Sequence, residues 1–139
     1  MGAPSEHLAE AAMDPLLKKL MFKGQSPVLI LRAPEELRGV AAKFGQAADS
    51  TVKKGPYAFA LAFAKSLADA DEIGKTARDA LEEAAVFWMA YPKGTSKKYK
   101  GADINRDTGN ARMQKHGFQG VSMVAIDDDW SAMRFRRLH

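Results

Sequence analysis

Residues 57–96, YAFALAFAKSLADADEIGKTARDALEEAAVFWMAYPKGTS, decide the fold that the sequence predicts. Residues 58–64 and 85–91 are short apolar runs, and the segment between them, 67–84, repeats apolar residues at helical spacing. A strand without a polar alternate face has to be covered on both faces, which is typical of a parallel sheet between helices. The stretch therefore predicts strand, helix and parallel strand, joined by a right-handed crossover.

The residues before this stretch predict one more strand and its helix. Residues 28–31, VLIL, form a buried strand, and Pro34 with the two acids that follow it marks a helix start. A short edge strand is expected around residues 48–52. Nearer the N-terminus, Ser5 can cap a first helix that Pro15 interrupts, giving two short helices or a kink.

The residues after the stretch predict a loop, a short helix and a hairpin. Residues 93–101 form a basic loop with no acid, and Asp103 or Asn105 can cap a helix that runs to about Lys115. Residues 118–126 and 130–137 read as two antiparallel strands around an acidic turn at 127–129. The predicted class is α/β, a three-layer open sheet, mostly parallel with a C-terminal antiparallel hairpin.

Composition limits the class of protein. A chain of 139 residues predicts one domain, residues 1–139, with a leading helical segment at 1–26 and the terminal hairpin at 118–138. The absence of cysteine excludes a disulfide scaffold, a cysteine-ligated zinc site and a cysteine nucleophile, and it fits the cytoplasm. Acids interrupt residues 1–21, and no apolar run approaches about 18 residues, so neither a signal peptide nor a membrane span is expected.

A candidate ligand site follows from where the predicted strands end. In open α/β sheets, ligands bind beyond the carboxyl ends of the strands where strand order reverses, which we expect between the strands at 28–31 and 57–64. The side chains there are cations and hydroxyl groups, which suit a phosphate or carboxylate: Arg32, Lys65, Ser66, Tyr91, Lys93 and Ser96. The alternative, which we favour, is that the cations solvate the sheet edge. Their ion-pair partners would then be Glu35, Glu36 or Asp69.

No cofactor is expected at this edge. Dinucleotides and S-adenosylmethionine need a glycine-rich turn after the first strand, because the backbone must approach the ligand closely. Residues 31–36, LRAPEE, contain no glycine, and Pro34 removes one amide donor. Ser66 and Ser96 lack a nucleophile elbow or a paired base, so the sequence assigns no catalytic residue.

Metal and nucleic-acid sites are less favoured still. His7, His116 and His139 are far apart in sequence, so no metal site is expected, and the acids at 127–129 are better explained as a solvated turn. Residues 93–100 and 134–137 place an aromatic side chain among cations, the pattern of single-strand binding. That composition is common on ordinary surfaces, so nucleic-acid binding is the third hypothesis.

The last predicted strand carries large residues on both faces: Trp130, Met133 and Phe135. We expect the Trp130 side to pack under a helix. If Met133 and Phe135 are exposed, they form an apolar interaction surface suited to a dimer partner. The equal alternative is that both faces are covered within one chain.

Several segments together resemble a family of small bacterial proteins of unknown function. The quoted segments are FAKS at 63–66, WMAYPK at 88–93 with Ser96 after it, VLILRAPE at 28–35 and IDDDWSAMRFR at 126–136. The resemblance runs from about Leu16 onward and rests chiefly on a closing D-x-x-W-S-A-x-R-F-R strand. This chain departs from it at Arg32, where the family has Asn, in a longer loop at 93–101, and at 128–129, where a Glu-Thr-like pair is expected.

The family is similar to a shortened class I methyltransferase-like Rossmann domain. The resemblance implies a scaffold rather than an activity, because a fold alone confers no reaction. The sequence therefore predicts a non-catalytic binding or interaction protein, in which a homodimer is one expected state. The alternative is an enzyme or small-molecule binder that holds an anionic ligand at the strand ends.

Overall fold

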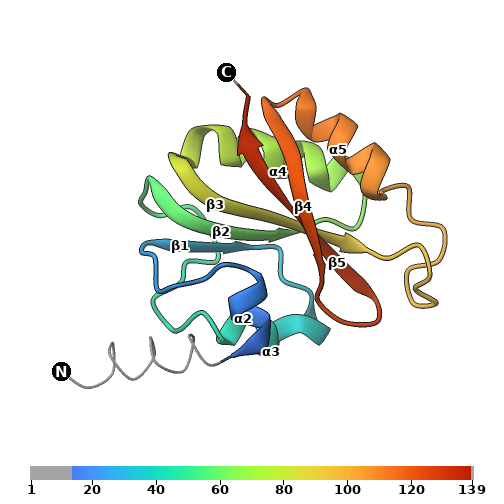
Figure 1. Cartoon of the computed structure of the whole chain (residues 1–139), viewed down its shortest axis with the longest axis horizontal. Coiled ribbons are helices and arrows are strands. Elements are labelled where there is room, and N and C mark those ends of the chain that lie inside the picture. The colour runs from blue at the N-terminus through green and yellow to red at the C-terminus, as the bar shows by residue number, and fades with distance from the viewer. Residues whose placement is uncertain (1–13, 139) are drawn as a thin grey trace.

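The computed structural model describes residues 14–138, and the predicted Ser5 cap, His7 and His139 lie outside them. Five strands form one sheet in the order β1-β2-β3-β5-β4 (Figure 1). β1 pairs with β2 and β2 with β3 in parallel, whereas β3–β5 and β5–β4 are antiparallel. The three parallel strands and the terminal hairpin are therefore confirmed. The bounds are β1 Val28–Leu31, β2 Tyr57–Phe63, β3 Leu81–Pro92, β4 Phe118–Ala125 and β5 Trp130–Arg137.

Helices cover both faces of the sheet, which confirms the three-layer arrangement. α4 (Leu67–Ala80) and α5 (Arg106–Gln114) cover one face. The other face carries the shorter elements α2 (Pro15–Lys19), η1 (Glu35–Leu37) and α3 (Arg38–Ala42) (Figure 1). Because β2 is buried along almost its whole length between these layers, it needs no polar face.

Each face of the sheet has its own hydrophobic core. On the α4–α5 face, alanines of β2 let Ile73 of α4 pack closely, and Phe87 meets Phe118 edge to face with ring centroids 5.1 Å apart. On the opposite face the side chains are larger, and Trp88 donates its indole N–H to the Leu20 carbonyl at 2.7 Å. That hydrogen bond ties the end of α2 to the centre of the sheet.

The predicted helix at 67–84 is too long by four residues, because α4 ends at Ala80 and Leu81 already has extended backbone. At this point the chain enters the sheet, where Leu81 pairs with Tyr57 of β2. The Arg137 guanidinium of β5 donates to the Leu81 carbonyl at 2.8 Å and to the Ala77 carbonyl at 3.4 Å, and the Ala77 carbonyl also accepts the Leu81 amide. A side chain distant in sequence thus helps to satisfy the carbonyls at the end of the helix.

The structure also resolves the predictions made for Pro15 and for the edge strand at 48–52. Pro15 does not kink a helix but begins one, with the Asp14 carboxylate capping α2 through the amides of Leu16 and Leu17. The edge strand expected at 48–52 shrinks to a single parallel bridge between Asp49 and Leu29 on the outer side of β1. Strand order therefore reverses at β1, because the bridging residue Asp49 lies on the side of β1 away from β2.

Candidate functional site

The carboxyl ends of β1, β2 and β3 lie together at one edge of the sheet, on the right in Figure 1. Five of the six predicted ligand residues follow these ends: Arg32, Lys65, Ser66, Lys93 and Ser96. Tyr91 belongs to β3 itself and is buried, with its hydroxyl against the Met123 sulfur at 3.7 Å. Burial raises the pKa of Tyr91, so this hydroxyl remains protonated inside the α5 layer and does not face the strand ends.

Arg32 is held by an ion pair within the chain. Its guanidinium lies 3.2 Å from an Asp69 carboxylate oxygen, and the second oxygen of Asp69 accepts the Lys65 amide at 2.9 Å. Asp69 is one of the partners that the sequence suggests for the plainer interpretation. Arg32 also has a positive φ of 61°, so this turn uses a conformation that glycine adopts more easily, without having a glycine.

The N-terminus of α4 also binds groups from its own chain. Ser66 caps the helix by accepting the Asp69 amide at 3.1 Å, and the Leu67 amide donates to an Asp103 carboxylate at 2.9 Å. The free amides at a helix N-terminus are what an anionic ligand would use. Here the Asp103 carboxylate and the Ser66 hydroxyl already accept the amides of Leu67 and Asp69.

The basic loop at 93–101 is anchored to the β4–β5 hairpin. The Ser96 side chain is buried and donates to the Asp129 carboxylate at 2.8 Å, while it accepts the Tyr99 amide at 3.1 Å. The Lys93 amide donates to the Asp129 carbonyl at 2.8 Å. The hydroxyl of Ser96 is therefore fully used in fixing the loop.

Tyr99 and Glu36 join this loop to the turn after β1. The Tyr99 hydroxyl donates a short hydrogen bond to the Glu36 carboxylate, which also lies 3.3 Å from the Lys98 ammonium and 3.4 Å from the Trp130 indole nitrogen. The Tyr99 ring packs edge to face on Trp130 at 5.1 Å, and the Lys65 ammonium lies 5.6 Å from its centroid. One aromatic side chain thus connects the ends of three strands and the hairpin.

Both members of this pair have displaced pKa values. The hydrogen bond from Tyr99 lowers the pKa of Glu36 to about 2, against an ordinary value of 4.5. Burial, with the carboxylate next to it, raises the pKa of Tyr99 to about 12. Over the physiological range the pair therefore stays as phenol and carboxylate, a stable tether rather than an acid–base couple.

Sequence reasoning names Glu36 as an ion-pair partner at this edge but misses its bond to Tyr99, and it misses the roles of Tyr99, Asp103 and Asp129. From the sequence, Asp103 is expected to start a helix and Asp129 to lie in a solvated turn. The available signal was compositional: a loop rich in lysine needs acids nearby, and the acids at 35–36 and 127–129 follow strands that end at the same edge.

The predicted interaction surface needs correction. Trp130, Met133 and Phe135 have exposed fractions of 0%, 5% and 2%, so the condition for an apolar patch on β5 is not met. β5 is an interior strand, because β4 pairs with its outer edge. Phe135 packs against Phe87, and Trp130 contacts Phe63 and Tyr99 as expected for a side chain packed under other elements.

An open hollow of about 630 Å³ lies beside β1, between α3 and the segment that bridges to β1. Small side chains line much of it, and Arg32 and Arg38 contribute to its wall. Arg38 is exposed and lies 3.9 Å from Glu35, a distance at which the ion pair is weak. The two arginines suit a small anion, whereas Asp49, whose carboxylate accepts the Tyr57 hydroxyl, adds one negative charge to the same wall.

Two further classes of site can be addressed for residues 14–138. No group of three or more histidine, aspartate or glutamate side chains there is placed to hold a metal ion. No helix within the same residues is long and apolar enough to cross a bilayer.

Comparisons with known proteins bear on the fold. No family model matches the sequence, and no curated protein matches it. Among solved structures, the methyltransferase CcbJ from Streptomyces caelestis superposes with a TM-score of 0.56 at 11% identity, covering 98% of this chain and 97% of that one. The chain has a methyltransferase-like Rossmann fold.

Two further structures agree. The mitomycin 7-O-methyltransferase MmcR gives a TM-score of 0.58 at 13% identity, over 96% of this chain and 53% of that one. The N-methyltransferase NodS from Bradyrhizobium japonicum WM9 gives 0.50 at 11% identity, over 80% and 73%. Identities this low establish the methyltransferase-like fold and leave the activity open.

The residues present do not fit the cofactor that a methyltransferase-like fold suggests. Arg32 and Pro34 occupy the turn after β1 where S-adenosylmethionine needs close approach to backbone amides. Asp49, on the bridge outside β1, accepts the Tyr57 hydroxyl at 2.6 Å and so serves the opposite end of the sheet. The turn after β1 therefore lacks the phosphate-type geometry, and Asp49 is already bound within the chain.

Proposed function

We propose that this protein is a non-catalytic binding or interaction domain built on a methyltransferase-like scaffold. The observation that carries the proposal is that the chain's own side chains occupy the groups a ligand would use at the strand ends. Asp69 binds Arg32, Asp103 binds an amide at the start of α4, and Glu36 binds Tyr99. Each contact replaces an interaction that a cofactor or substrate would have to make.

The proposal includes the finer family assignment. The closing strand WSAMRFR and the first strand VLIL, together with the missing glycine-rich turn, support membership of the family of small bacterial proteins described above. A member of such a family would keep the sheet and the antiparallel hairpin while losing the cofactor crevice. The lack of cysteine supports a cytoplasmic setting.

Calorimetric titration with S-adenosylmethionine and S-adenosylhomocysteine tests this proposal. We expect no saturable heat and no change in the unfolding temperature. A ligand present at 100 times its dissociation constant would stabilise the fold by about 2.7 kcal/mol, which is easily seen in a thermal scan. One-to-one binding of either compound would overturn the proposal, because the strand ends would then have to open.

The second candidate is a binder of a small anion in the hollow beside β1, supported by the two arginines in its wall. It predicts that inorganic phosphate or a dicarboxylate raises the unfolding temperature. The effect should be lost in Arg38→Ala and kept in Arg78→Ala, a matched change at an exposed arginine on α4. No response in the wild type would remove this candidate.

Nucleic-acid binding through the basic loop remains the third hypothesis. Lys98 is already paired with Glu36, which reduces the charge available from this loop. Binding through its other lysines would show as retention on heparin that falls steeply with salt.

A further inference from the structure

We infer that strand β4 is a self-association edge, through which two copies of this chain pair antiparallel and extend the sheet across a two-fold axis. The inference concerns a part of the molecule away from the strand ends, and it holds whether or not those ends bind a ligand. It also replaces the dimer surface that the sequence suggested on β5, moving it one strand outward.

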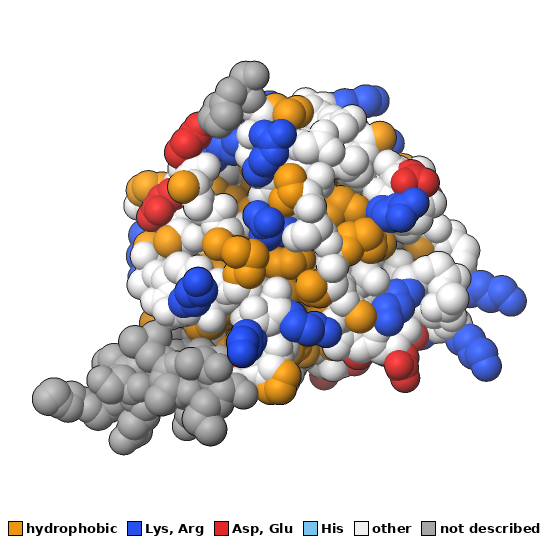
Figure 2. Space-filling model, viewed as in Figure 1, with side chains coloured by type: hydrophobic (Ala, Val, Ile, Leu, Met, Phe, Trp, Pro, Cys, Tyr) orange, Lys and Arg blue, Asp and Glu red, His pale blue; other side chains and the backbone are white. Residues whose placement is uncertain are grey.

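The first observation is that β4 lacks the charges that protect most edge strands. Its eight residues, FQGVSMVA, include no charged residue and no proline. Charged residues and proline are two devices that protect edge strands, because unpaired backbone groups otherwise recruit another strand. β4 does carry a third device, an irregularity in its pairing with β5 between Gly120 and Ser122, and residues 122–125 beyond it are paired regularly. Here Val121 and Met123 are instead 40% and 44% exposed. Figure 2 shows apolar side chains gathered over the middle of the face in view, with Lys and Arg side chains among and around them and the acidic side chains toward its borders.

The second observation concerns the backbone groups on the outer edge. Lys19 donates to the Ala125 carbonyl at 2.8 Å, and the Gly120 amide donates to Asn110 at 2.9 Å. Both ends of the edge are therefore capped. Because the Ala125 carbonyl points outward, the backbone of Met123, two residues earlier, points the same way. Among the described residues, no side chain hydrogen-bonds to the backbone at 121–124, so the open groups lie at the centre of the edge.

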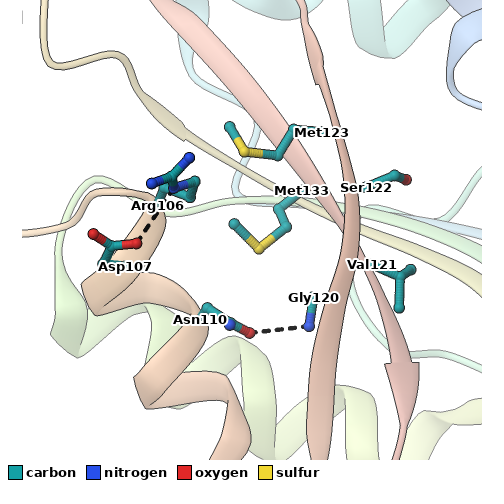
Figure 3. A pocket seen from close by; sticks show the side chains of 8 residues that line it. All are labelled: Arg106, Asp107, Asn110, Gly120, Val121, Ser122, Met123 and Met133. Carbon is teal, nitrogen blue, oxygen red and sulfur yellow. Dashed lines mark hydrogen bonds and ion pairs between the residues drawn. The ribbon is translucent and has the colours of Figure 1, made fainter.

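The third observation is a hollow of about 260 Å³ beside this centre, between β4 and α5 (Figure 3). Met123 and Met133 turn their sulfur atoms toward it, and Val121 points to the other side of the strand. Gly120 leaves room for the Met133 side chain in the wall of the hollow, since a Cβ atom at that position would come within 2.4 Å of the Met133 sulfur. In strand addition, backbone hydrogen bonds provide affinity and such pockets receive alternate side chains.

These observations favour a second copy as the occupant. A two-fold axis through Met123 places Met123 of both copies side by side on the α5 face, where each can fill the hollow beside the other strand. Methionine is flexible enough to adapt to a cavity of irregular shape. The same axis sets Ser122 opposite the partner's Val124, and it brings no two charged residues of β4 together.

Sedimentation velocity over a concentration series tests the inference with the full chain. We expect the wild type to approach twice 15.2 kDa. Met123→Lys should weaken association about tenfold or more, because it sets two ammonium groups against each other at the axis. Met21→Lys is the matched control, since Met21 is 38% exposed and lies outside β4. A wild type that stays monomeric, or a dimer that Met123→Lys leaves unchanged, would overturn the inference.

Crosslinking gives a second measurement that does not depend on a destabilising charge. The sequence has no cysteine, so Met123→Cys carries a single thiol. Residues that face each other in a hydrogen-bonded antiparallel pair have Cα atoms about 5.5 Å apart, within disulfide range. Diamide, as the oxidant that takes up the two thiol hydrogens, should link Met123→Cys into a covalent dimer and leave Met21→Cys a monomer. Equal crosslinking of both variants, or none of Met123→Cys, would refute this geometry.

Discussion

Replacing Tyr99 by phenylalanine tests whether the strand ends are held closed by the chain itself. The change removes the hydroxyl that binds Glu36 but keeps the ring that packs on Trp130 and beneath the Lys65 ammonium. Glu36 would retain Lys98 at 3.3 Å, so its pKa should rise from about 2 only part of the way to 4.5. The variant therefore isolates one hydrogen bond at the centre of the closed edge.

The expected loss of stability is about 1–1.5 kcal/mol at pH 7. The displacement of the Glu36 pKa from 4.5 to about 2 would by itself correspond to about 3.5 kcal/mol, at about 1.4 kcal/mol per pKa unit. The Glu36 side chain is 29% exposed. Water therefore screens part of this energy, and Lys98 and Trp130 keep another part, which reduces the share lost with the hydroxyl to about 1–1.5 kcal/mol. In a domain of this size the change lowers the unfolding temperature by about 3–5 °C.

The loss should depend on pH at both extremes. A carboxylate with a lowered pKa contributes stability that is complete above 4.5 and disappears as the pH falls toward 2. A phenol with a raised pKa contributes stability that is complete below 10 and disappears as the pH rises toward 12. The wild type and Tyr99→Phe should therefore differ most between these limits and converge outside them.

Urea unfolding of both proteins across this pH range is the assay. Tyr91→Phe is the matched control on the acid side, because its hydroxyl contacts only the Met123 sulfur in the described structure and binds no carboxylate. It should leave the acid dependence unchanged. A Tyr99→Phe difference that is constant with pH, or absent at pH 7, would refute the role of the Tyr99–Glu36 bond in closing the edge.

Three further substitutions test packing and helix capping in the fold. Gly74→Ala should destabilise by about 2 kcal/mol in thermal unfolding, since its Cβ would lie 2.6 Å from the His116 ring; an unchanged midpoint would mean that the ring moves aside at no cost. Trp88→Phe should cost about 2–3 kcal/mol in urea unfolding, because it leaves the buried Leu20 carbonyl without its donor and removes ring volume; a loss below about 0.5 kcal/mol would show that the carbonyl finds another partner. Ser66→Ala should cost about 1 kcal/mol by removing the cap of α4, whereas Ser66→Thr, which keeps a hydroxyl, should recover most of it; equal losses in the two variants would contradict the capping role.

The sheet could be predicted because its strands carry their own signal. The run at 28–31 and the run in β2 have no polar face, so only a sheet covered on both sides can bury them. The end of α4 could not be predicted in the same way. Residues 81–84, LEEA, favour a helix locally, but Leu81 begins β3 and pairs with Tyr57 of β2, and its carbonyl binds Arg137, more than fifty positions later. Local propensity loses there to a contact whose sequence distance hides it.

The position of the candidate site could be predicted from the sequence, but the pairing of its side chains with one another could not. Arg32, Lys65 and Ser96 follow strand ends, and parallel strands bring such residues to one edge. Whether they face a ligand or each other depends on side-chain pairing that spacing does not encode. Ser96 meets Asp129 across 33 positions, and Tyr99 meets Glu36 across 63. The favoured alternative for Arg32, an ion pair with a nearby acid, is the arrangement present.

The closed edge follows from one property of the loop after β3. In an open α/β sheet, the loops beyond the strand ends normally diverge and leave a crevice between them. Here Ser96 fixes the loop to the hairpin at Asp129, and the next turn carries Tyr99 across to Glu36 beyond β1. The loop therefore spans the edge from the hairpin to the first strand. Since Asp69 of α4 also binds the Arg32 guanidinium after β1 and the Lys65 amide after β2, a ligand would have to displace several charged hydrogen bonds at once. The loss of one of these contacts does not open the edge, so Tyr99→Phe should lower stability without creating a cofactor site.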